Sequence, residues 1–182
     1  MYGMVNEGIR QFVGLNHDEA TWETICSKAA VSQTSFERMA SYDDAITYQL
    51  VGAICDHMNL SGEEALESFG AYWVEYVGSS SFGNLLKLAG RTLTEKLDGL
   101  DDLHARVFAS MPNLKPPSFE LETLDDIHHN LHYFSDRDGL APMVVGLVHG
   151  LANVTGETVE VHQIEAKADG ADHDVFAIKL LD

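Results

Sequence analysis

The chain has 182 residues, 45% of them hydrophobic and 22% charged, with a formal net charge of −18. This length and composition predict one globular domain whose core is large enough to enclose a pocket. Nucleic acid and anionic membrane surfaces are not expected as partners, because both are bound mainly through clustered Lys and Arg, and the chain has only 11 such residues.

The cysteines and the opening segment predict a cytoplasmic protein. Cys26 and Cys55 stand alone without metal-ligand spacing, so they are expected to be small apolar side chains in a reducing compartment. The opening MYGMVNEGIR carries Glu7 and has no basic flank, which does not fit a signal peptide. The longest apolar run, LAPMVVGLVHGLA, is shorter than a membrane span.

The first part of the chain is predicted to be helical, because its apolar residues recur at helical spacing between short polar breaks. The acidic turn SYDD suits the start of one helix, and Ser61 with Glu64 has the spacing of a capping box at the start of the next. The segment GSSSFGN is expected to be a turn. The predicted helices cover residues 5–13, 21–29, 46–58 and 61–76.

The period of the apolar residues changes in the second part of the chain. An amphipathic stripe predicts a single helix over 93–110, closed by Pro112. The fold class expected is α+β, with an N-terminal helical part followed by a small antiparallel sheet with a packed helix. The predicted strands are 118–124, 129–135, 158–164 and 175–180, and the helix between the middle two is 141–153.

The stretch LHYFSDRDG is the first candidate site. On an extended strand Tyr133, Ser135 and Arg137 share one face, so two hydroxyls and a guanidinium would stand in a row. Such a row suits a ligand with two carboxylates, because the Arg fork pairs with one and the hydroxyls donate to the other. The alternative is the polar outer face of an edge strand, which alternation alone would favour.

His104 is the second candidate, because it lies on the apolar seam of the helix predicted over 93–110. A polar imidazole there costs free energy unless a partner satisfies it. It fits either a hydrogen-bonded core residue or a single axial ligand to iron within an apolar sleeve. The spacing of residues does not decide between the two.

Two other histidine-rich segments are not expected to be sites. His128 and His129 are neighbours on a predicted strand and point apart, so a metal cluster that includes the nearby His132 is not expected. The segment GADHD, with His173, is expected to be a polar turn. A hydrolytic site is not expected there, because no Ser or Cys stands in a recognisable nucleophile elbow.

Five segments resemble, in order and spacing, the haem-nitric oxide/oxygen binding (H-NOX) domains, and the cyanobacterial type most: MYG, LDDLHARV, KPPSF, LHYFSDRDGL and GADHDVFAIK. The family includes the sensor domain of soluble guanylate cyclase and stand-alone bacterial proteins. The resemblance covers nearly the whole chain, and YxSxR with an upstream helical His is its specific feature. It implies one domain over 1–182, with a helical lobe of 1–60, a proximal-helix and sheet lobe of 61–182, and haem b held between the helices and the sheet.

The resemblance also implies a role for each matched residue. The two haem propionates would be the anions held by Tyr133, Ser135 and Arg137. His104 falls at the proximal iron ligand, and Pro117 at the proline that presses on the porphyrin. An apolar sleeve, one imidazole and a three-donor row are what a buried haem with two charged arms requires.

Other matched residues fall on the distal side. Val5 matches an N-terminal aliphatic contact, and Trp73 and Met143 match residues that pack over the distal face. Members that hold oxygen stably present a distal Tyr where this chain has Pro142, so the resemblance implies a sensor of nitric oxide and carbon monoxide that discriminates against oxygen. Three unmatched tyrosines remain possible donors: Tyr2, Tyr72 and Tyr76.

The expected function is therefore gas sensing without catalysis. Nitric oxide would weaken the bond to His104, the helix over 93–110 would move, and an effector such as a histidine kinase or a cyclic-dinucleotide enzyme would read the change. The acidic charge would favour a basic partner surface. The alternatives are a peroxidase-like haem enzyme, an oxygen-binding haem protein and a carrier of another apolar ligand. The first would need a distal acid–base pair, which the sequence does not offer, and the last would need neither His104 nor Arg137.

Overall fold

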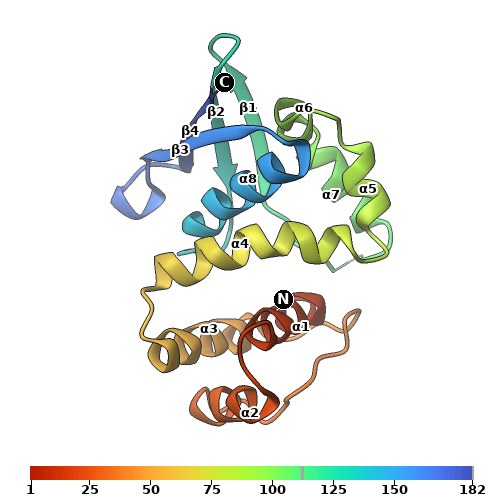
Figure 1. Cartoon of the computed structure of the whole chain (residues 1–182), viewed down its shortest axis with the longest axis vertical. Coiled ribbons are helices and arrows are strands. Elements are labelled where there is room, and N and C mark those ends of the chain that lie inside the picture. The colour runs from red at the N-terminus through yellow and green to blue at the C-terminus, as the bar shows by residue number, and fades with distance from the viewer. Residues whose placement is uncertain (112, 182) are drawn as a thin grey trace. The chain divides into compact units, whose positions relative to one another are not determined.

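The computed structural model describes residues 1–111 and 113–181, so Pro112, which was expected to close a helix, lies outside the described residues. The chain forms two compact units, Met1–Phe69 and a second that begins at Gly70 (Figure 1). The boundary falls inside helix α4 (Gly62–Gly78). Among the described residues, no helix has the length and apolar character needed to cross a membrane.

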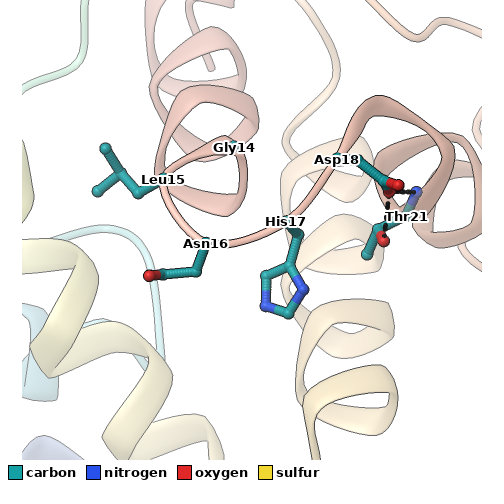
Figure 2. Close-up of a pocket in the computed structure, with 6 residues that line it drawn as sticks. All are labelled: Gly14, Leu15, Asn16, His17, Asp18 and Thr21. Atoms are coloured by element: carbon teal, nitrogen blue, oxygen red, sulfur yellow. Dashed lines mark hydrogen bonds between the residues drawn. The ribbon is translucent and has the colours of Figure 1, made fainter.

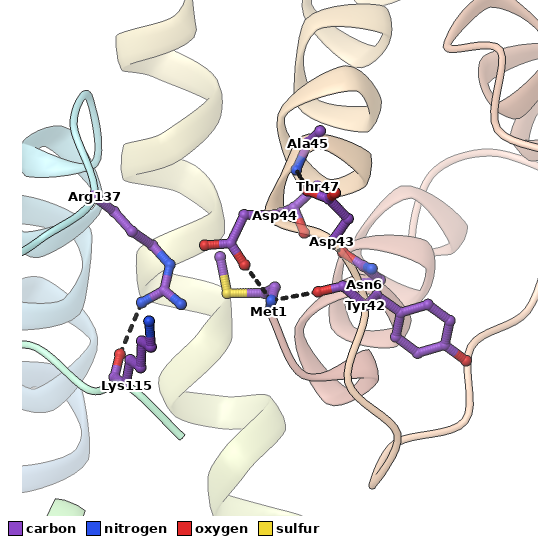
Figure 3. Close-up of polar contacts among 9 residues, drawn as sticks. All are labelled: Met1, Asn6, Tyr42, Asp43, Asp44, Ala45, Thr47, Lys115 and Arg137. Carbon is purple, nitrogen blue, oxygen red and sulfur yellow. Dashed lines mark hydrogen bonds and ion pairs between the residues drawn. The ribbon is translucent and has the colours of Figure 1, made fainter. Parts of the chain in front are cut away.

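Helices build the first unit, as expected. They are α1 (Gly3–Gly14), α2 (Glu19–Lys28), α3 (Asp44–Met58) and the first part of α4. The predicted capping box of α4 is confirmed, because Glu64 N donates to Ser61 Oγ at 3.1 Å and Ser61 N donates to Glu64 Oε2 at 2.8 Å. A buried polar pair joins α1 to α3, in which Thr47 Oγ1 donates to Asn6 Oδ1 at 2.7 Å (Figure 3).

The second unit contains the sheet, and it confirms the α+β class. Its strands are β1 (Ser118–Thr123), β2 (His128–Phe134), β3 (Thr158–Glu165) and β4 (Asp174–Leu181). They lie in the order β1-β2-β4-β3, and every neighbouring pair is antiparallel. Helix α8 (Ala141–Thr155) packs against this sheet and shares its hydrophobic core (Figure 1).

The prediction of a single helix over 93–110 was wrong. Two helices stand there, α6 (Leu93–Asp98) and α7 (Leu100–Phe108), with Gly99 between them. An ideal Cβ on Gly99 would lie 2.8 Å from the carbonyl oxygen of Ala89, so the chain turns where α6 packs closely on the preceding segment. The sequence reading also missed α5 (Gly83–Leu88), which begins inside the predicted turn GSSSFGN.

The prediction that Tyr133, Ser135 and Arg137 form a row on one strand was also wrong in part. Strand β2 ends at Phe134, so Ser135 and Arg137 follow it in a bend and turn rather than on its face. The edge-strand alternative fails as well, because β2 pairs with both β1 and β4. Tyr133 is only 5% exposed and belongs to the hydrophobic core.

The turn between β1 and β2 provides a pH-dependent prediction. Asp125 Oδ1 accepts hydrogen bonds from the backbone N–H groups of Ile127 at 2.9 Å and His128 at 2.8 Å. These bonds, together with the His128 side chain, lower the pKa of Asp125 from 3.8 to about 2. Because the folded-state pKa is depressed, this stabilisation is present above about pH 4 and is lost as the pH falls towards 2.

The measurement is an NMR titration of the Asp125 carboxyl carbon and of the two amide protons. We expect all three signals to move together with an apparent pKa near 2. Asp125→Asn should abolish the amide shifts over this range. An ordinary aspartate titration near 3.8 would contradict the bonding at this turn.

Candidate functional site

Most of the residues predicted for the site in the second unit meet at one segment, KPPSF, which runs from Lys115 to Phe119. It leads from the last turns of the helical region into β1. Arg137 contacts its first residue, Lys115, and both His104 and Tyr133 lie against its last residue, Phe119. We call Lys115–Phe119 the junction segment.

His104 lies in the middle of α7, and its imidazole stands 5.9 Å from the ring of Phe119 between ring centroids. Its Nδ1 atom is buried and has no hydrogen-bond partner. Burial lowers the pKa of the imidazole below its usual value, and the Asp101 carboxylate and the Pro117 carbonyl oppose that shift without reversing it. The ring is therefore kept neutral, which is the form that binds a metal ion. The Pro117 carbonyl lies close enough to the imidazole to raise its pKa, so the role of His104 as an iron ligand rather than a core histidine stays a prediction.

Asp101 ties α7 to the start of β1, a role that the sequence reading missed. Its Oδ2 atom accepts from Ser118 Oγ at 2.7 Å, and its Oδ1 atom accepts from the backbone N–H of Phe119 at 2.8 Å. Asp101 lies three residues before His104, and residues at this spacing lie on neighbouring positions of a helix surface. The helix that carries His104 is thus anchored to the junction segment one turn away from the imidazole.

Phe119 links the histidine to the strand residue of the motif. It pairs with Tyr133 across the β1–β2 ladder, and the two rings lie 5.3 Å apart between centroids. His104, Phe119 and Tyr133 therefore form a continuous row of rings. The sequence analysis did not identify Phe119 as a site residue. Its position at the end of KPPSF and the pairing of β1 with β2 place its ring between His104 and Tyr133.

The turn after β2 is held by its own hydrogen bonds. Arg137 N donates to Ser135 Oγ at 3.1 Å, which fixes the two residues relative to each other. Arg137 Nη1 donates to the Lys115 carbonyl oxygen at 2.7 Å (Figure 3). Lys167 Nζ donates to the Ser135 carbonyl oxygen at 3.0 Å and to Asp138 Oδ1 at 2.9 Å. Ser135 and Arg137, which were expected on a strand, are instead positioned by this turn and by the junction segment, whereas Tyr133 lies on β2.

Trp73 and Met143 lie on α4 and α8, which approach each other closely. An ideal Cβ on Gly70 would lie 2.2 Å from the Met143 carbonyl oxygen, and one on Gly150 would lie 2.9 Å from the Ala71 carbonyl oxygen. Both Trp73 and Met143 are half-buried. Their expected place over the distal face of a ligand stays a prediction.

The remaining predicted contact, Val5, lies in the first unit on α1 and is half-buried. The first unit also has an open depression at the turn between α1 and α2 (Figure 2). Asp18 Oδ1 accepts there from Thr21 N at 2.9 Å and from Thr21 Oγ1 at 2.8 Å, so its polar groups cap a helix. No residue predicted for the site lines this depression: its lining is Gly14, Leu15, Asn16, His17, Asp18 and Thr21.

Comparison with known proteins gives the family. The family model of haem-NO-binding proteins matches residues 2–163. The chain belongs to the H-NOX family. H-NOX domains are haem-based gas-sensor domains and are not themselves catalytic.

The similar proteins agree with this assignment. An H-NOX protein from Shewanella oneidensis, solved in the Fe(II)NO ligation state, superposes with a TM-score of 0.91 and 19% identity over the whole of both chains. The soluble guanylate cyclases gcy-31 and gcy-32 of Caenorhabditis elegans are 26% and 30% identical over 90% and 84% of this chain. The H-NOX chain spans 23% of the length of each cyclase.

Proposed function

We propose that this H-NOX chain binds haem b through His104 and senses nitric oxide and carbon monoxide at ferrous iron, with poor or no stable oxygen binding. The observation that carries the proposal is the convergence of His104, Tyr133 and Arg137 on one junction segment in a chain of a haem-binding family. The signal is proposed to leave through release or movement of His104 and to reach a separate effector protein.

The residues fit a haem in three respects. His104 presents an imidazole whose pKa is lowered by burial, and the ring stands beside Pro117 and an aromatic row. Pro117 is a half-buried, rigid residue next to that imidazole. Tyr133, Ser135 and Arg137 supply hydroxyl and guanidinium donors for the propionate carboxylates.

Haem would supply the iron to which the gas binds. His104 would hold it from α7, and Asp101 would keep α7 against β1 through the two hydrogen bonds to Ser118 and Phe119. A movement of His104 must then pull on this anchor before α7 can shift. The bistable element in the proposal is therefore α7 with its contacts to the junction segment.

The proposed gas selectivity rests on Pro142. It occupies the first turn of α8 and has neither a side-chain hydrogen-bond donor nor a backbone N–H. A polar bound dioxygen gains most from a nearby donor, whereas nitric oxide and carbon monoxide depend on one far less. Tyr76 is 5% exposed and packs against Trp73 and Tyr72. If oxygen binds stably, Tyr76 is the residue to test as the hydrogen-bond donor.

The experiment is an anaerobic visible spectrum of the reduced, haem-loaded protein before and after each gas is added. We expect a five-coordinate ferrous spectrum that changes with nitric oxide and carbon monoxide and shows no stable oxygen complex in air. A stable oxygen complex would contradict the selectivity, and steady turnover of peroxide would favour a haem enzyme instead. Failure to take up haem at all would overturn the proposal.

The anchor at Asp101 gives a second test. Asp101→Asn keeps the shape of the side chain but leaves a single acceptor oxygen, so one of the two accepted hydrogen bonds is lost and the other is no longer charged, a loss of about 1–3 kcal/mol. We expect haem binding to be retained, and we expect α7 to move more easily, so that His104 is released several-fold more often after nitric oxide is added. The ratio of five- to six-coordinate absorbance measures this release.

The matched control for that test is Asp102→Asn, because Asp102 is the exposed neighbour in the same helical turn. It should leave the ratio unchanged. Equal ratios in the wild type and in Asp101→Asn would show that the anchor does not resist movement of α7.

The effector is proposed to be a histidine kinase or a cyclic-dinucleotide enzyme with a basic docking surface. The support for the charge of that surface is the net charge of −18 on this chain, since complementary charge steers association and disfavours acidic partners. Binding to such an effector should therefore weaken as the salt concentration rises.

A further inference from the structure

The fold brings together two histidines that lie 41 positions apart in the sequence, His132 on β2 and His173 just before β4. Their facing nitrogens, His132 Nδ1 and His173 Nε2, are 2.8 Å apart. The His173 ring also stacks on Phe134, with 4.2 Å between the ring centroids. The two side chains are 25% and 14% exposed, so the pair is partly shielded from water but reachable.

Each ring also faces a carboxylate on its other side. His173 Nδ1 lies 2.5 Å from Asp172 Oδ1, and His132 Nε2 lies 3.7 Å from Glu122 Oε2. Asn130 Nδ2 donates to the same Glu122 oxygen at 2.8 Å and helps to hold it. Carboxylates in this position orient the histidines of metal sites, because they fix which nitrogen carries the proton.

The facing nitrogens of the pair can share either a proton or a metal ion. Asp172 accepts a hydrogen bond from His173 Nδ1, so His173 Nε2 presents a lone pair. A proton on His132 Nδ1 gives a hydrogen bond between the rings at 2.8 Å. With that proton on His132 Nε2 instead, Nδ1 also presents a lone pair, and two imidazole lone pairs that face each other suit one metal ion.

We propose that His132 Nδ1 and His173 Nε2 bind one zinc ion. With the ion between them, both facing nitrogens use their lone pairs, and the proton of His132 sits on Nε2 and points towards Glu122. Both rings would bind the ion in their neutral form, and His173 Nδ1 would keep its hydrogen bond to Asp172. Two ligands of a tetrahedral zinc ion stand about 3.3 Å apart, so the facing nitrogens, at 2.8 Å, would separate by about half an ångström and both rings would turn to direct their lone pairs at the ion.

The donor set favours zinc over the hard cations. Calcium and magnesium prefer oxygen ligands, whereas imidazole suits zinc and its neighbours in the transition series. No group of three or more His, Cys, Asp or Glu side chains in residues 1–111 and 113–181 has the geometry to hold a metal ion, so two protein ligands and water would complete the coordination. The ion would tie β2 to the loop before β4.

The test is a calorimetric titration of zinc chloride into the haem-loaded protein. We expect one zinc ion per chain, at least tenfold weaker binding in His132→Gln and in His173→Gln, and no change in the Soret band. His162→Gln is the matched control, because His162 is an exposed histidine on the neighbouring part of the same sheet, and it should bind zinc as the wild type does.

A second variant keeps both ligands in place. Asp172→Asn should weaken zinc binding about tenfold or more, since removing a carboxylate that orients a ligand has that effect. Zinc should also raise the melting temperature of the wild type but not that of His132→Gln. Absence of binding, equal binding in His132→Gln, or a Soret change on zinc addition would each overturn the proposal, the last because it would place the ion at the haem ligand.

Discussion

Replacing His104 by glycine is expected to abolish the five-coordinate ferrous spectrum of the haem-loaded protein. The imidazole is the proposed bond between the chain and the iron, and it lies beside Phe119 and Pro117 of the junction segment. Haem should be retained poorly, and free imidazole, which can enter the space left by the side chain, should restore much of the spectrum. The measurement is the reduced absorbance spectrum with and without imidazole.

The control for this substitution is His17→Gly, because His17 is exposed in the turn between α1 and α2 and takes no part in the proposed site. Glycine within α7 also costs about 1 kcal/mol of helix stability, so the circular dichroism of both variants should be compared. A His104→Gly protein with an unchanged ferrous spectrum and no need of imidazole would show that His104 is not the ligand.

Gly70→Ala is expected to destabilise the protein by about 2 kcal/mol, although alanine is the better helix former. The added Cβ would meet three backbone atoms, the Met143 carbonyl oxygen at 2.2 Å, the Leu147 nitrogen at 3.0 Å and the Met143 carbonyl carbon at 3.1 Å. Backbone atoms cannot rotate away as a side chain can, so α4 and α8 would have to separate. The melting temperature of the haem-loaded protein measures the effect.

Gly52→Ala is the matched control and should have the opposite sign. Gly52 is exposed in the middle of α3, and nothing lies within 4 Å of an ideal Cβ at that position. Alanine there should stabilise the protein by about 0.5–1 kcal/mol, because it restricts the unfolded chain and exposes less backbone. A Gly70→Ala protein at least as stable as the wild type would show that α4 and α8 do not need this close approach.

The Gly70 substitution also bears on the proposed distal side. Trp73 and Met143 lie on the two helices that it would separate, so gas binding should change together with stability if these residues cover the ligand. In Gly52→Ala, by contrast, gas binding should stay as in the wild type. The nitric oxide and carbon monoxide spectra of both variants test this expectation.

Local periodicity in the sequence determined most of the elements of this protein. Helical spacing predicted α1 to α4 and α8, and the change to period two predicted the four strands, because burial of one face imposes these spacings on neighbouring residues. The same logic placed His104 on the apolar seam of a helix. The resemblance that rests on LDDLHARV, KPPSF and LHYFSDRDGL then gave the family, which the comparisons confirm.

Contacts between distant parts of the chain decided the rest. The close approach of Gly99 to the Ala89 carbonyl joins separate segments, and the positions of Ser135 and Arg137 depend on where β2 stops pairing and on the Lys115 carbonyl. The meeting of His132 with His173 needs β2 beside β4. Local sequence patterns do not predict such contacts. The carbonyl oxygen or partner strand comes from a distant part of the chain, so it does not affect the spacing of the residues that it positions.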